Sequence, residues 1–173
     1  MKKNVLIVIS IITAFVFILF INEFIKAGAI YLMYTKDISF VINGISLSSV
    51  FILPENHNLY KDLIIYLLPV FSVIIFIELS GVLLSKIYNN NIRTGLIVFQ
   101  IMNIGYLVIM MLINAVSVLV YQFISTDWLT FIEVSKFSTT KGLLITFLLI
   151  AVIFTYINFT SNRIRKYITF IKA

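Results

Sequence analysis

The chain has 173 residues, of which 61% are hydrophobic and only 12% are charged, and its mean hydropathy is +1.10. A soluble domain would be about a quarter charged, and a disordered or collagen-like chain would not combine 15% aromatic residues with two prolines. The net charge of +6 comes from basic residues at the ends of apolar runs, which indicates membrane orientation rather than nucleic-acid binding. The absence of cysteine excludes disulfides and thiolate metal sites.

The first apolar run contains 19 uncharged residues, enough to cross a hydrocarbon core of about 30 Å. We expect a first membrane helix over about 5–25. A cleaved signal peptide is the alternative, because residues 27–29 are Ala-Gly-Ala, a small-residue pattern typical of cleavage sites. The length of the run and the intervening charges of Glu23 and Lys26 favour a retained helix.

Residues 38–49 predict a β-hairpin between the first two membrane helices. Asn43-Gly44 separates two short alternating runs, and this pair is a strong hairpin signal because both turn positions need positive φ. A re-entrant membrane segment is the alternative, because the stretch carries no charge. The polar loop that follows contains the only histidine, His57, which we expect to be solvated.

Three further apolar runs predict membrane helices at about 63–85, 95–121 and 142–162. Pro69 is tolerated inside the first of them if neighbouring helices satisfy the freed backbone carbonyl. Trp128 favours the headgroup level, and residues 129–141 are expected to form a polar interfacial helix. The predicted fold class is an all-α integral membrane protein with four transmembrane helices and a small β-hairpin, in a single domain of residues 1–173.

Four spans place both termini on one side of the membrane, where eight basic residues collect, against five on the other side. The eight are Lys2, Lys3, Lys86, Arg93, Arg163, Arg165, Lys166 and Lys172. This bias favours cytoplasmic termini, in a bacterial cytoplasmic membrane. The expected partners are the lipid bilayer and another membrane protein or peptide, and not nucleic acid.

Polar side chains recur at spacings of three and four residues along the third span, which places them on one helix face. The face comprises Gln100, Asn103, Leu107, Met110, Asn114, Ser117 and Tyr121. Glu78, in the second span, lies at a similar depth to Gln100, Asn103 and Asn158, and these four form a predicted intramembrane polar cluster. An ionisable group at this depth is a candidate functional site, whereas a hydrogen-bonded glutamate that links helices is the structural alternative. A small transporter or channel subunit that uses Glu78 is therefore the alternative function.

Glu23 and Lys26 form an i,i+3 pair that by itself marks the membrane interface. Residues 22–27, Asn-Glu-Phe-Ile-Lys-Ala, resemble the His-Glu-x-x-His-Ala motif of site-two-protease-like intramembrane zinc metalloproteases. In that family a β-hairpin and further spans follow the motif, and an Asp at the end of a later span is the third zinc ligand. By this resemblance Asn22 and Lys26 stand at the two histidine positions, Glu23 at the general base and Asp127 at the third ligand.

The departures from this motif predict a chain that holds no zinc and no other cofactor. Zinc needs neutral imidazole or anionic donors, whereas a protonated Lys26 has no lone pair and the Asn22 amide is a poor ligand. Asp127 is followed by Trp128, where the family has Gly. We therefore expect a non-catalytic membrane protein of accessory, regulatory or immunity type, on a decayed protease scaffold. An active metalloprotease is the least favoured hypothesis, because only Glu23 and Asp127 support it.

Overall fold

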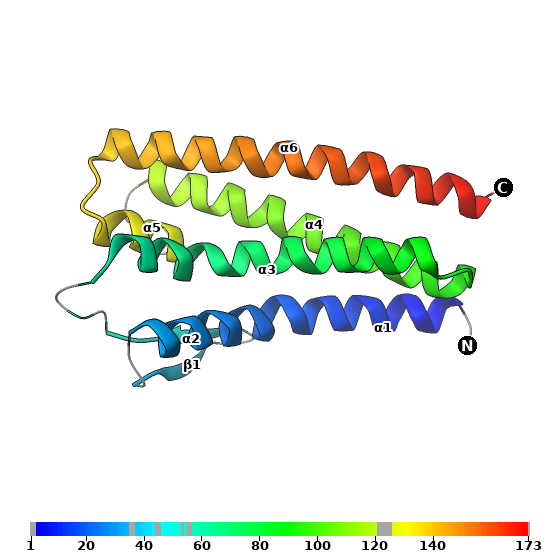
Figure 1. Cartoon of the computed structure of the whole chain (residues 1–173), viewed down its shortest axis with the longest axis horizontal. Coiled ribbons are helices and arrows are strands. Elements are labelled where there is room, and N and C mark those ends of the chain that lie inside the picture. Colours follow the sequence, from blue (N-terminus) through cyan, green and yellow to red (C-terminus); the bar gives the residue numbers. More distant parts are fainter. Residues whose placement is uncertain are drawn as a thin grey trace.

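The computed structural model describes residues 3–34, 37–43, 46–52, 54, 57–120 and 126–172. In chain order its elements are α1 (Lys3–Val16), the π-helical segment η1 (Phe17–Ile21), α2 (Asn22–Met33), β1 (Ser39–Asn43), β2 (Ser46–Val50), α3 (Leu59–Lys86), α4 (Asn90–Leu119), α5 (Asp127–Val134) and α6 (Thr139–Lys172). Among the described residues, four helices are long and apolar enough to cross a membrane, and α1, η1 and α2 together form the first of them. The predicted count of four long apolar helices and the predicted hairpin are confirmed (Figure 1).

Each long helix begins before the apolar run that predicted it, and α4 ends at Leu119, two residues before the predicted end. α3 begins after Asn58, whose side chain accepts a hydrogen bond from the Tyr60 N–H, and α4 begins after Asn89, which accepts from Asn91 and Ile92. These side chains satisfy backbone donors that the first turn of a helix leaves unpaired. Counting apolar residues alone therefore missed the polar first turns, and also the continuation of α6 past residue 162.

The turn of the hairpin lies one residue later than predicted, which shifts the pairing of the strands by two residues. β1 and β2 are antiparallel, and Asn43 is paired with Ser46 as the last strand residue of β1. Asn43 is thus not a turn residue, and the connection consists of residues 44 and 45, which lie outside the described residues. A two-residue connection that starts with Gly is another sequence pattern that hairpins favour, which accounts for the shift.

The helices form an elongated bundle with both termini at one end and with the hairpin and α5 at the other (Figure 1). α4 is the central helix, because it packs against α1, α3 and α6, while α2 packs against α3. The approach of α1 to α4 depends on Gly95, where a Cβ atom would lie only 2.7 Å from the Ser10 hydroxyl oxygen. The first helix is thus held against the bundle at a glycine.

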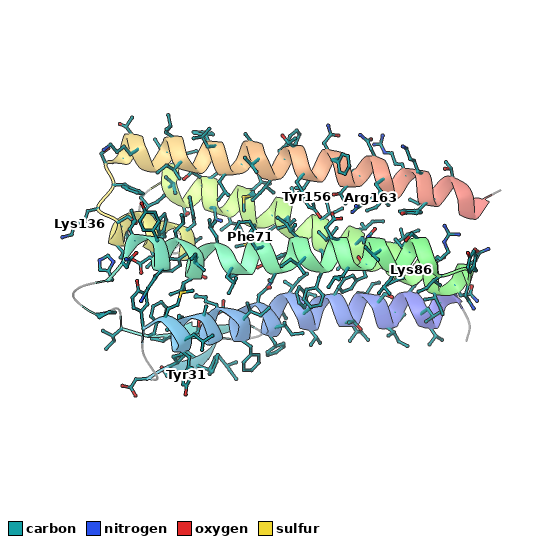
Figure 2. All side chains as sticks on the ribbon, viewed as in Figure 1. Tyr31, Phe71, Lys86, Lys136, Tyr156 and Arg163 are labelled. Carbon is teal, nitrogen blue, oxygen red and sulfur yellow. The ribbon has the colours of Figure 1, made fainter. Side chains whose placement is uncertain are left out.

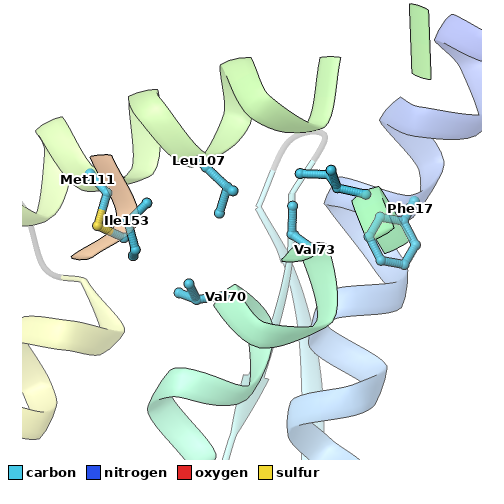
Figure 3. Packing of buried hydrophobic residues seen from close by; sticks show 7 residues of the cluster. Phe17, Val70, Val73, Leu107, Met111 and Ile153 are labelled. Atoms are coloured by element: carbon cyan, nitrogen blue, oxygen red, sulfur yellow. The ribbon is translucent and has the colours of Figure 1, made fainter. Parts of the chain in front are cut away.

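The main hydrophobic core joins η1, α3, α4 and α6 (Figure 3). It contains Phe17, Val70, Val73, Ile77, Leu107, Met111 and Ile153. The outer surface is also apolar: on α6, Leu148 is 60% exposed and Phe154 is 67% exposed. A soluble protein rarely leaves such surface in water, so this surface is consistent with an integral membrane protein.

The helix α5 packs into the end of the bundle. Trp128 is only 3% exposed, and its indole N–H donates to the Thr146 hydroxyl at 2.8 Å. Phe131 is buried beside it. The prediction of a polar interfacial helix over 129–141 is therefore wrong, because the helix ends at Val134 and its apolar side chains close the bundle between α3 and α6.

Candidate functional site

The segment η1 turns the polar residues of α2 into the bundle. The Asn22 N–H donates to the Phe17 carbonyl, five residues back, so η1 holds one residue more than an α-helical turn. The buried face accordingly passes from Phe17 to Asn22 and then to Lys26. In a regular helix of 3.6 residues per turn, Ile21 would follow Phe17 on that face, yet Ile21 is 38% exposed.

Lys26 is the centre of the candidate site. It is 3% exposed, and its Nζ atom lies 2.6 Å from Asp127 Oδ1 on α5 and 3.7 Å from Glu23 Oε2 on its own helix. A buried ammonium group is costly unless it is paired and hydrogen-bonded, and here two carboxylates meet that need. The structure thus brings together Glu23, Lys26 and Asp127, although Asp127 is far away in the sequence.

The Glu23 carboxylate also holds the hairpin. Its Oε2 atom accepts hydrogen bonds from both the backbone N–H and the hydroxyl of Ser49 on β2, each at 2.9 Å. The Ser49 N–H therefore points away from β1 and towards α2. Glu23 is engaged by Ser49 and by Lys26, which gives this carboxylate a positioning role.

Asn22 links α2 to α3. It is 3% exposed, and its side-chain oxygen accepts a hydrogen bond from the Ser72 hydroxyl at 2.6 Å. The same hydroxyl lies 2.7 Å from the Pro69 carbonyl oxygen, so the contact is made one turn after the helical proline. The amide oxygen of Asn22, the atom that could coordinate a metal, is therefore already bound.

The site opens into a cleft of about 460 Å³ between α2, β2, α3 and α5. Its lining residues are Lys26, Ser49, Val50, Phe51, Tyr66, Asp127 and Thr130. The Asp127 side chain is 36% exposed, so it is the charged group that a bound molecule would meet. In the part of the chain that the structure describes, no three His, Cys, Asp or Glu side chains come together to hold a metal ion. The arrangement offers charge and hydrogen bonds for recognition.

A second polar cluster, which the sequence did not predict, closes the same end of the bundle. Asp62 is fully buried; it accepts a hydrogen bond from the Tyr34 hydroxyl at 2.7 Å and contacts His57 Nδ1 at 2.6 Å. Burial and the bond to Asp62 raise the pKa of Tyr34 to about 12. His57 is therefore bound to a buried carboxylate, and the expectation of a solvated histidine was wrong. His57 precedes Asn58, which caps α3, and it lies about one helical turn before Asp62 in the sequence. This spacing is the sequence feature that could have predicted the contact between His57 and Asp62.

Glu78 is bound by α6, and not by the polar face of α4. Its carboxylate accepts hydrogen bonds from Arg163 at 2.7 and 2.9 Å and from the Tyr156 hydroxyl at 2.7 Å. Both donors lie on α6 on the side that faces α3 (Figure 2). Arg163 follows the predicted last span, but α6 continues to Lys172 and brings the guanidinium to the depth of Glu78.

The other members of the predicted intramembrane cluster do not meet Glu78. Gln100 and Asn103 are fully buried; Gln100 donates to the Ile77 carbonyl at 3.0 Å, and Asn103 donates to the Phe99 carbonyl of its own helix at 2.8 Å. Asn158 lies exposed on α6. Asn114 and Ser117 are buried as well, so the described polar residues of α4 share one face, as predicted, and Tyr121 lies outside the described residues. This face serves helix packing.

In comparisons with known proteins, the chain matches no family model, no curated protein and no solved structure. The resemblance to site-two-protease-like metalloproteases thus stays a prediction that rests on the motif residues.

Proposed function

We propose that this chain is an integral protein of a bacterial cytoplasmic membrane with both termini in the cytoplasm. The eight-to-five distribution of basic residues supports this orientation. Because the chain has no cysteine, single cysteines report sidedness directly. An impermeant thiol reagent should label Lys136→Cys in intact spheroplasts and Asn90→Cys only after permeabilisation. The reverse pattern would overturn the orientation. Figure 2 shows Lys136 at the end of the bundle opposite Lys86, which lies just before Asn90 in the chain.

We infer that the protein is a non-catalytic binding protein of accessory, regulatory or immunity type, on a scaffold similar to site-two proteases. The observation that carries this inference is the 2.6 Å contact between Lys26 Nζ and Asp127 Oδ1. The resemblance assigns positions 22, 26 and 127 to metal ligands, and such ligands must converge on one point. The contact between positions 26 and 127 supports the shared scaffold, since nothing in a six-residue motif requires contact with residue 127, whereas the Asn22 amide is bound to Ser72.

The same contact argues against catalysis. The Lys26 ammonium supplies the positive charge that a zinc ion would supply, but it has no vacant coordination position and cannot activate a water molecule. Glu23, at the position of the general base, is bound to Ser49 and Lys26. What is left is an open polar cleft with one accessible carboxylate, Asp127, suited to bind a peptide segment or another membrane protein.

Zinc analysis tests the scaffold and the lost activity together. The purified wild-type protein should hold no stoichiometric zinc. The double variant Asn22→His with Lys26→His should hold about one zinc per chain, because two imidazoles and Asp127 then converge. The matched control is Phe24→His with Gly28→His, the same spacing on an exposed face of α2, which should bind zinc far more weakly. Stoichiometric zinc in the wild type would overturn the non-catalytic proposal, and equal affinity in the two double variants would refute the shared scaffold.

Photocrosslinking tests the binding function. A benzoylphenylalanine residue at Thr130, which lines the cleft, should give one discrete adduct in native membranes. The same residue at Leu148, on the exposed apolar face of α6, is the control and should react only with lipid. The adduct should disappear when Asp127 is replaced by Ala. An adduct pattern shared by both positions would contradict a partner in the cleft.

The alternative function, a small transporter or channel subunit, depends on Glu78. Its two hydrogen bonds with Arg163 favour a structural link between α3 and α6, and for this reason we place the binding function first. A flux that is abolished by Glu78→Gln in proteoliposomes and unaffected by Glu23→Gln would reverse that order.

A further inference from the structure

A second cleft lies at the opposite end of the bundle, beside the chain termini. It has a volume of about 380 Å³ and is lined by Leu84, Ser85, Ile87, Tyr88, Arg93 and Tyr167. These residues come from the end of α3, from its connection to α4, from the second turn of α4 and from α6. The cleft is thus located where three of the long apolar helices reach their polar ends.

The Nε atom of the Arg93 guanidinium is buried there without a hydrogen bond, and across the described residues no ion pair includes Arg93. A buried polar atom without a partner is costly, and a charged one more so. An arginine near the start of α4 is also unfavourable with respect to the helix dipole, and the first turn of α4 contains no acidic residue. An anion in the cleft would relieve both costs.

The surroundings of the cleft also favour an anion. Arg93, Arg163, Arg165 and Lys166 all belong to the end of the bundle that holds the chain termini, whereas Glu78 is the one acidic residue of this half of the bundle among the residues that the structure describes. Glu78 is already bound by Arg163, so it does not neutralise the cleft. Tyr88, which is 92% exposed, and the half-buried Tyr167 add two phenol groups as further hydrogen-bond donors.

We propose that this cleft binds the phosphate of an anionic phospholipid headgroup in the leaflet on the side of the termini. The Arg93 guanidinium would donate to the phosphate oxygens, as arginine does to phosphate through parallel N–H bonds, and Tyr88 and Tyr167 would donate from the rim. Ile87, which is partly exposed, supplies an apolar wall that suits the first carbons of a lipid and that a site for free phosphate does not need. Basic pockets between membrane helices are suited to anionic headgroups. This inference is independent of the function proposed for the other end.

The test is thermal unfolding of the full chain in neutral detergent, titrated with phosphatidylglycerol, phosphatidylcholine or inorganic phosphate. Phosphatidylglycerol should raise the melting temperature of the wild type, and the other two should not. Arg93→Gln should need about tenfold more phosphatidylglycerol for the same shift. Arg165→Gln, which removes the same charge from an exposed position at the same end, should respond like the wild type.

Each other result overturns the proposal. An equal loss in Arg165→Gln would show general attraction by a basic surface, and a shift with inorganic phosphate would show that the ligand is not a lipid. An equal response to phosphatidylcholine would exclude recognition of an anionic headgroup. If Arg93→Gln does not fold, Tyr88→Phe serves instead, because an exposed hydroxyl does not support the fold. That variant should weaken the response to phosphatidylglycerol, and an unchanged response would refute the site.

Discussion

Replacing Lys26 by Met should destabilise the protein strongly. Met has a similar volume and keeps the packing of α2, so the substitution removes the ammonium group and little else. It leaves the carboxylates of Glu23 and Asp127 facing each other with no cation between them. The side chains of these two residues are 18% and 36% exposed, so neither carboxylate is fully hydrated.

The size of the effect follows from this burial. Removal of one partner from a fully buried ion pair costs about 3–5 kcal/mol. Because water reaches Asp127 and partly compensates the freed carboxylate, we expect a loss of about 2–3 kcal/mol in the free energy of unfolding. At about 2–4 °C per kcal/mol for a chain of this length, the melting temperature should fall by roughly 4–12 °C.

Trp128, the only tryptophan, provides the assay. It is buried in α5 beside Asp127, so its fluorescence reports unfolding at the site in detergent micelles. The control is Lys141→Met, which removes an exposed lysine at the same end of the bundle and should change the free energy by less than about 0.5 kcal/mol. In the Lys26→Met background, Asp127→Asn should cause no further loss, because the repelling carboxylate is gone.

Equal stability of Lys26→Met and Lys141→Met would show that the Lys26 ammonium does not stabilise the fold. Additive losses in the double variant would contradict the ion pair, because a direct ion pair requires a coupling free energy between the two positions of about 1 kcal/mol or more.

Two further predictions concern packing and pH. Gly95→Leu should destabilise the bundle by about 1–3 kcal/mol, since a Cβ atom there meets Ser10 at 2.7 Å. Gly105→Ala is the control: a Cβ atom there meets no atom within 4 Å, so this variant should be neutral or stabilising by up to about 1 kcal/mol. Equal changes in the free energy of unfolding would contradict the close approach of α1 to α4. Because the pKa of Tyr34 is raised from 10.0 to about 12, the stability that this residue contributes is complete below pH 10 and is lost as the pH rises through 12. Tyr34→Phe should therefore flatten the loss of stability over this window in unfolding measured against pH, and an unchanged profile would contradict the assignment.

The four long helices could be predicted because uncharged apolar runs of about twenty residues are typical of helices that cross a membrane. Their ends could not, because they depend on individual partners. α6 continues through Arg163 because Glu78 lies at the same depth on α3. A charged residue after an apolar run is ordinarily assigned to water, and only the structure shows that this one turns back to a carboxylate.

The site was predictable in part. The motif resemblance placed Lys26 and Asp127 at one point, where the structure has them in contact. The bond from Ser49 to Glu23 was not predictable, because it depends on strand register. A turn at Asn43-Gly44 would set Ser49 opposite Ile38, whereas the observed register sets it opposite Phe40 and directs its N–H to α2. A shift of one residue at the turn changes which strand groups reach a neighbouring helix.

The extra residue of η1 gives the site a tolerance to chain length. The wide turn takes up one residue more than an α-helical turn, so Asn22 lies on the same face as Phe17 although it is five residues away. Deletion of one codon within Phe17–Ile21 would place Asn22 four residues after Phe17, and a continuous α-helix would then keep Asn22 and Lys26 on the buried face. Conversion of this segment to a regular α-helix with no residue removed would instead rotate α2 by about 100° about its axis, and Ile25 would replace Lys26 against Asp127. A single in-frame deletion is therefore compatible with the buried charge cluster, whereas straightening the segment at full length is not.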